Sequence, residues 1–185
     1  MSARPLASTI KVKLTGLQHE CIDRIDNEDF SGVMETVRKD HARWGVFVSD
    51  DFLRAGILAL KQYYAVALLD PMNEHAVSDS IDPFWHAHIL DTPAYIPFCD
   101  RVFGQYVHHK PLDHSNAAEL RHVARLYAYT TGIYRKMFSY VDEAFYPEVL
   151  SDAELVCTHM AIASTVLRQD THFPRVDIAQ VFATV

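Results

Sequence analysis

Apolar side chains recur at helical spacing along most of this 185-residue chain. In the segment 29–44 one helical face is apolar and the opposite face is charged, which is typical of an amphipathic helix packed on a core. Its apolar members are Phe30, Val33, Met34, Val37 and Trp44. Short runs typical of strands occur only at 45–48 and 105–109. The pattern predicts an all-α fold: one compact helical domain over residues 1–185, with about six or seven helices.

Helix start and stop signals divide the chain further. Ser49 and Asp50 are good N-caps for a long apolar helix that Asp70-Pro71 ends. Asp82-Pro83 and Thr92-Pro93 each place a proline at a first helical position, which predicts short helices to Leu90 and to about Gly104. A longer helix is expected from about residue 116 to 140. The sequence "SDAE" at 151–154 resembles a capping box and predicts a last helix over 155–167, whereas the polar segment 72–80 is expected to be a loop.

The charge and cysteine content exclude several classes of protein. The net charge is −7, from 17 basic and 24 acidic residues, without the basic stripe that nucleic acid or an anionic membrane requires. The three cysteines lie far apart and form no C-x-x-C pair, so a disulfide framework is not expected. We found no apolar core of a signal peptide. These features predict a cytoplasmic protein that binds neither nucleic acid nor membrane, and they leave the oligomeric state open.

Five of the eleven histidines lie between Ser78 and His114. In a helix His86 and His88 point about 200° apart, so they cannot bind one ion from the middle of a helix. Asp82 and His86 are four residues apart and share a face, while His88 shares a face with Asp91. A third ligand for a metal ion would come from His108 or His109, after Gly104. Two imidazoles and a carboxylate form an ordinary ligand set for Zn²⁺ or Fe²⁺.

The same segment has a simpler interpretation. Trp85, Ile89, Tyr95 and Phe98 are expected to pack between two short helices. A histidine among such residues is more often a hydrogen-bonded core residue than a metal ligand. The spacing alone leaves both readings open.

The segment "SDSIDPFWHAHILDTPAYIPFCDRVFGQYVHHKP" resembles the signature region of the glycine-rich domain-containing protein-like family. The residues that carry the resemblance are Asp82, Trp85, His86, His88, Leu90, Tyr95 and His109. The match favours His109 over His108 as the further histidine that follows the W-H-x-H motif. The resemblance implies a stand-alone version of the family's helical module, in which the W-H-x-H region acts as a unit, and it implies no particular chemistry.

Two hypotheses follow. In the first, the chain is a metal-dependent enzyme that acts on a small organic substrate through Fe, Zn or Cu, with chemistry that includes an oxidoreductase. Its metal ligands come from Asp82, His86, His88 and His109, its pocket for a cofactor or substrate is lined by Trp85 and Tyr95, and its further catalytic residues are His88 and Asp91. In the second, the chain is a non-enzymatic helical module that binds a partner or ligand, and the W-H-x-H histidines are structural.

Overall fold

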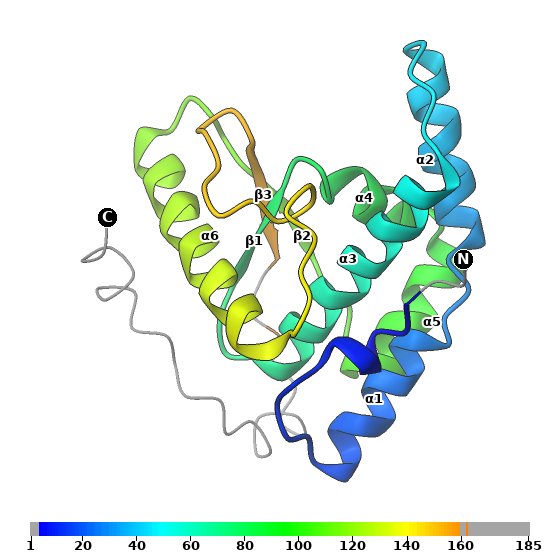
Figure 1. The fold of residues 1–185 in the computed structure, drawn as a ribbon. Helices are drawn as coiled ribbons and strands as arrows, with labels where there is room; N and C mark the ends of the chain where they lie inside the picture. The colour runs from blue at the N-terminus through cyan, green and yellow to red at the C-terminus, as the bar shows by residue number, and fades with distance from the viewer. Residues whose placement is uncertain (1–3, 160–161, 163–185) are drawn as a thin grey trace.

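The computed structural model describes residues 4–159 and 162. These residues form six α-helices, a short 3-10 helix and three strands, and Figure 1 shows their arrangement. The helices are α1 (Gly16–Asp26), α2 (Ser31–Arg43), α3 (Asp50–Leu69), α4 (Asp82–Leu90), α5 (Thr92–Phe103) and α6 (Ala117–Met137). The 3-10 helix η1 is Ala7–Thr9, and the strands are β1 (His75–Ser78), β2 (His109–Pro111) and β3 (Leu155–His159).

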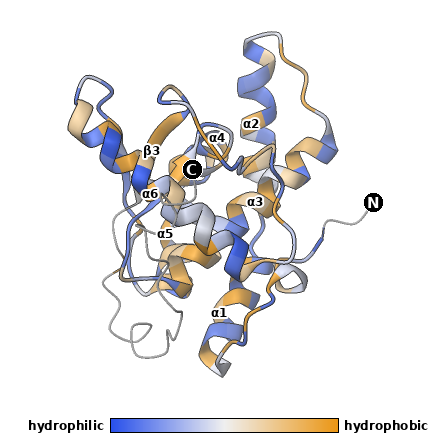
Figure 2. Cartoon of the chain, turned by 60° about the vertical axis from the view of Figure 1, so that its left-hand side comes forward, coloured by the Kyte–Doolittle hydropathy of each residue, from blue (hydrophilic) through white to orange (hydrophobic). Residues whose placement is uncertain are grey.

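Helix α3 is the centre of the fold and contacts α1, α2, α4 and α6. Its first turn is capped by Ser49, whose side chain accepts a hydrogen bond from the backbone N–H of Phe52. The helix is long and apolar enough to cross a membrane, but 72% of its apolar window is buried by the rest of the protein. Figure 2 shows the contrast between the largely hydrophobic α3 and the hydrophilic, projecting α2. The predicted core helix is therefore confirmed.

The predicted helix boundaries around the histidine segment are confirmed as well. Helix α4 begins at Asp82 and α5 at Thr92, each followed by proline. Helix α5 ends at Phe103 and is capped by Gly104, whose φ of 71° is a left-handed conformation that glycine adopts without strain. Helix α6 is capped by Asn116, whose side chain accepts from two backbone N–H groups. Helix α1, by contrast, was not predicted.

The fold is mostly helical, as predicted, but a small antiparallel sheet corrects the all-α prediction. Its strand order is β1-β3-β2, so the last strand in the sequence lies in the middle. Strand β1 lies within the segment predicted as a loop, and all four of its residues are buried. The strand candidate at 45–48 is instead the irregular turn between α2 and α3. The second candidate overlaps β2 at His109 alone.

Strand β3 replaces the start of the predicted last helix. The Ser151 backbone N–H donates to the Glu154 carboxylate, which is one half of a capping box. Ser151 Oγ also donates to that carboxylate instead of accepting from the Glu154 N–H, which bonds to the Ser151 carbonyl, and the residues form a turn. Leu155 and Cys157 are buried on either side of the half-buried Val156, a period of two that belongs to a strand. The rest of the predicted helix, 160–167, lies outside the described residues except for residue 162.

A buried polar network ties β1 to the C-terminus of α3 and to the middle of α6. The Asp70 carboxylate accepts hydrogen bonds from Tyr129 Oη (2.5 Å) and Asn73 Nδ2 (2.7 Å), and it lies 3.3 Å from His75 Nε2. Burial alone would raise the pKa of Asp70, but the contacts with His75, Tyr129 and Asn73 outweigh it and hold that pKa below its usual value.

We expect Asp70→Asn to lower the free energy of unfolding by about 2 kcal/mol at pH 7, because the amide leaves buried donors unpaired. A carboxyl whose pKa is lowered by folding stabilises the protein above its unfolded pKa of about 3.9, and the stabilisation is lost as the pH falls further. The difference between wild type and variant should therefore shrink below pH 4. Urea unfolding at several pH values measures it. The exposed Asp152 supplies the control, since Asp152→Asn should leave stability within about 0.5 kcal/mol.

Candidate metal centre

Asp82 is the first residue of α4, and its carboxylate is the hub of a polar cluster. His86 lies one turn later on the same helix, with Nδ1 3.4 Å from Asp82 Oδ2. His109 Nε2 lies 3.0 Å from Asp82 Oδ1, and Cys157 Sγ donates to the same oxygen at 3.0 Å. Because a carboxylate only accepts, His109 Nε2 carries the proton in this arrangement. Three side chains, from α4, β2 and β3, thus meet at the Asp82 carboxylate.

The register of the sheet brings His109 and Cys157 to the same side. Cys157 pairs with Pro111, and His109 lies two residues before Pro111 on β2. Because side chains alternate along a strand, His109 and Cys157 face the same side of the sheet. The N-terminus of α4 lies against that side, where the helix dipole also favours a negative side chain such as Asp82.

Burial and hydrogen bonding set the protonation of the cluster. Burial alone would raise the pKa of Asp82, but contacts with His109, Cys157 and His86 hold it below its usual value. Burial raises the pKa of the Cys157 thiol, and the neighbouring Asp82 carboxylate raises it further. At neutral pH Asp82 is therefore ionised and Cys157 is a neutral thiol. One donor atom each from Asp82, His109 and Cys157 lie within 4.8 Å of one another, a separation that suits three ligands of one metal ion.

The chain matches the sequence model of a known protein family. The sequence model of the UCP032817-like family matches residues 25–136, which is more than half of the chain. The chain belongs to the UCP032817-like family. The segment that it shares with the family includes Asp82, His86 and His109, whereas Cys157 lies beyond it. No curated protein and no solved structure matches the chain.

Within the family segment, His86 and His109 lie side by side at the surface of the cluster. Their ring centroids are 4.4 Å apart. The His86 side chain is 50% exposed, whereas those of Asp82 and His109 are 16% and 12% exposed. His86 therefore lies between the buried cluster and solvent.

His88, predicted as a ligand and as a catalytic residue, does not join the cluster. Its ring is buried on the other side of α4, where Nδ1 is 2.8 Å from Tyr64 Oη. Aromatic rings surround it: Phe30, Tyr64, Tyr95 and Phe98. Burial in this setting lowers the pKa of His88 to about 4, so the ring is neutral. The opposite directions of His86 and His88 follow from helical geometry, and the His88 ring bonds to Tyr64 of α3 although it shares a helical face with Asp91.

Asp91 also lies apart from the cluster. It is exposed at the junction of α4 and α5, where its backbone carbonyl accepts from Ala94 and Tyr95. This arrangement gives Asp91 a part in the turn between two helices. Neither of the two predicted catalytic residues, His88 and Asp91, therefore lies at the cluster of Asp82, His109 and Cys157.

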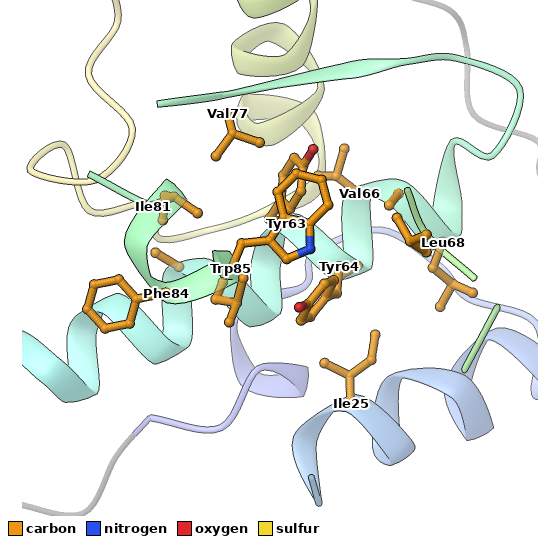
Figure 3. Close-up of a cluster of buried hydrophobic side chains, with 14 of the residues drawn as sticks. Ile25, Tyr63, Tyr64, Val66, Leu68, Val77, Ile81, Phe84 and Trp85 are labelled. Carbon is orange, nitrogen blue, oxygen red and sulfur yellow. The ribbon is translucent and has the colours of Figure 1, made fainter. Parts of the chain in front are cut away.

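Trp85 and Tyr95 lie in the core, with no exposed surface on which a cofactor could bind. Figure 3 shows Trp85 among Tyr63, Tyr64 and Val77. The Trp85 indole N–H donates to Tyr95 Oη (3.1 Å), which in turn donates to the Val107 carbonyl (2.7 Å). Val107 is two residues before His109. The Trp85 and His109 rings also pack against each other, with their centroids 4.9 Å apart. Both aromatic residues therefore position His109 from behind.

Cys157 is the member that sequence reasoning missed. Its segment was expected to be a helix, and a lone cysteine there reads as a small apolar residue. The signal that could have found it is the short apolar run Leu155, Val156 and Cys157 after a turn, which fits a buried strand as well as a helix.

Proposed function

We propose that this chain is a metal-dependent enzyme for a small organic substrate, with Asp82, His109 and Cys157 as metal ligands. The observation that supports the proposal is the convergence of three different donor types from three separate elements within 4.8 Å. A carboxylate, an imidazole and a thiol match the ligands of zinc, and the sulfur disfavours Mg²⁺ and Ca²⁺. Cys157 therefore makes Zn²⁺ the first choice among Fe, Zn and Cu.

The chain's own residues have distinct tasks in this proposal. Asp82 is already ionised, His109 must present Nε2 without its proton, and Cys157 must lose its thiol proton. Metal binding should consequently release protons and weaken as the pH falls. A divalent ion with an open coordination position lowers the pKa of a bound water or polarises a substrate oxygen. His86, half-exposed beside His109, is the group that would exchange a proton with a substrate approaching from solvent.

The test is metal binding by protein purified without an affinity tag and stripped with a chelator. We expect one Zn²⁺ per chain, an increased Tm, and a loss of affinity of at least about tenfold in Asp82→Asn and His109→Gln. His108→Gln is the matched control, because His108 is the exposed neighbour of His109. This variant should bind Zn²⁺ with the affinity of the wild type. Cys157→Ser should shift the preference from Zn²⁺ toward harder ions. Absence of stoichiometric metal, together with a Tm that no divalent ion changes, would contradict the proposal.

A second candidate is a non-enzymatic binding module in which the cluster is structural. It is supported by the hydrogen bonds that Asp82 already accepts from His109 and Cys157, which satisfy the buried carboxylate without an ion. In that case His109→Gln should lower stability by about 1–3 kcal/mol in metal-free protein, and added Zn²⁺ should leave both proteins unchanged.

A further inference from the structure

The turn after α2 exposes two aromatic side chains to solvent. Trp44 and Phe47 are 86% and 95% exposed, and Val46 between them is 48% exposed. Helix α2 lies at the edge of the molecule, and its C-terminal end extends beyond the other elements (Figure 1). Large apolar side chains exposed together mark an interaction surface, whereas exposed apolar side chains scattered singly are ordinary. We call Trp44, Val46 and Phe47 the aromatic tip, and none of them belongs to the proposed metal site.

The area of the aromatic tip restricts what can cover it. An aromatic side chain buries about 150–250 Å², so the two rings offer on the order of 350 Å² per copy of the chain. Two tips packed only on each other would bury roughly 700 Å², which is less than the roughly 1,200 Å² of the smallest stable interfaces. A partner that binds stably must therefore cover further surface, and the exposed face of α2 adjoins the tip.

The exposed face of α2 carries charges that complement a second copy of the same face. Glu35 and Lys39 lie one turn apart on it, with Lys39 Nζ 3.3 Å from Glu35 Oε1, and their side chains are 49% and 67% exposed. Two copies of α2 that pack antiparallel about a two-fold axis beside position 37 bring Glu35 of each copy to Lys39 of the other. A parallel arrangement would instead bring like charges together. Ser31 and Ala42, both small and exposed, lie on the same face and let the helices approach closely.

The antiparallel arrangement brings the aromatic tip of one copy to the N-terminal end of α2 of the other. At 1.5 Å per residue, Trp44 lies about 10 Å along α2 from the axis, as far as residue 30 lies in the opposite direction. Apolar surface is available near that end: Leu90 is 78% exposed and precedes Asp91, whose Oδ2 would lie 3.5 Å from a Cβ added to Gly32. Symmetry forms the contact twice, and each ring covers a comparable area on the other copy. The tips alone therefore account for roughly 1,400 Å², which is within the standard range.

We propose that the chain forms a symmetric dimer in which the two α2 helices pack antiparallel and the aromatic tip of each copy covers Leu90 of the other. A lipid surface is the competing occupant of an exposed aromatic tip. The basic residues beside the tip are paired within the chain, Arg43 with Asp40 and Arg38 with Asp50, so they attract anionic headgroups weakly. The charge pattern of α2 therefore favours a second copy over lipid.

Sedimentation velocity of the metal-free full chain tests the dimer. We expect a monomer–dimer equilibrium with a dissociation constant of about 10 μM or below, and association of Trp44→Ser that is at least about tenfold weaker. Val149→Ser is the control, because Val149 is 80% exposed but lies outside α2 and the aromatic tip, and this variant should dimerise as the wild type does. A chain that stays monomeric at concentrations about tenfold above that dissociation constant would overturn the proposal.

A charge-reversal pair tests the antiparallel packing. Glu35→Lys and Lys39→Glu should each weaken dimerisation at least about tenfold, because each creates two like-charge contacts between the copies. The double variant Glu35→Lys/Lys39→Glu restores opposite charges at both contacts and should dimerise within about threefold of the wild type. Both positions are exposed, so circular dichroism should show the wild-type helix content in every variant. Single variants that dimerise normally, or a double variant that stays monomeric, would contradict the antiparallel packing.

The fluorescence of Trp44 separates dimerisation from lipid binding. The second of the two tryptophans, Trp85, has no exposed surface, so a change in emission reports Trp44. We expect a blue shift as the protein concentration rises through the dissociation constant without lipid, and no further shift with phosphatidylcholine or phosphatidylserine vesicles. A blue shift that requires vesicles and does not depend on protein concentration would assign the aromatic tip to a membrane and would overturn the dimer.

Discussion

Replacing Gly56 with alanine is expected to lower the free energy of unfolding by about 3 kcal/mol, although alanine is the better helix former. A Cβ on Gly56 would lie 2.5 Å from Cε1 and 2.6 Å from Cε2 of Phe84, with Cζ closer still. The Phe84 ring cannot swing away easily, because it has no exposed surface and contacts the rings of Phe52 and Phe145. Gly56 is therefore what lets α4 approach α3.

Chemical denaturation of Gly56→Ala and of Gly32→Ala separates crowding from helix propensity. Gly32 lies in α2, and the atom nearest to its added Cβ is an Asp91 carboxylate oxygen at 3.5 Å, an ordinary contact. Gly32→Ala should consequently stabilise the protein, by up to about 1 kcal/mol. Adding Phe84→Leu to Gly56→Ala should cost less than the sum of the two single changes, since the shorter side chain relieves the overlap. Equal effects of the two glycine substitutions would refute the explanation.

His88 is expected to make the protein lose about 2 kcal/mol of stability between pH 7 and pH 5. Burial lowers the pKa of His88 to about 4 in the folded state, against about 6.5 in the unfolded chain. Below pH 6.5 His88 is protonated in the unfolded chain but stays neutral in the folded protein. The free energy of unfolding therefore decreases as the pH is lowered, until His88 is protonated in both states near pH 4. The window from pH 7 to 5 avoids most carboxylate titration.

The double variant Tyr64→Phe/His88→Phe should flatten this slope. It replaces both partners of the buried hydrogen bond with apolar rings, so no hydroxyl is left unpaired. Urea unfolding of chelator-treated protein at several pH values gives the slope. His19→Gln is the control, because His19 is exposed, and it should retain the wild-type dependence. If the double variant keeps the wild-type pH dependence of stability, that dependence comes from a titrating group other than His88.

Local patterns predicted the helices that carry the site, because their signals lie within a few residues of each boundary. Asp82-Pro83, Thr92-Pro93 and Gly104 are such signals, and the pairing of Asp82 with His86 follows from helical geometry alone. The preference for His109 over His108 came from the resemblance, and the structure brings His109 to Asp82.

The strands, Cys157 and the burial of His88 and Trp85 depend on contacts between distant segments, which a single sequence does not reveal. Strands β1 and β3 were missed because four or five residues give little periodic signal, and each pairs with a segment far along the chain. Cys157 was missed with its strand. His88 and Trp85 looked like site residues by their neighbours, and only the packing of Tyr64 and Tyr95 against them shows that they face the core.

The position of β3 in the middle of the sheet has a consequence for biosynthesis. Strands β1 and β2 each pair with β3 and have no ladder with each other, so neither has its partner until residue 155 has left the ribosome. During that interval the nascent chain exposes two unpaired strands, a state that promotes misassociation. The cluster at Asp82 also waits for Cys157, so the sheet and the proposed metal site should be completed in one late step.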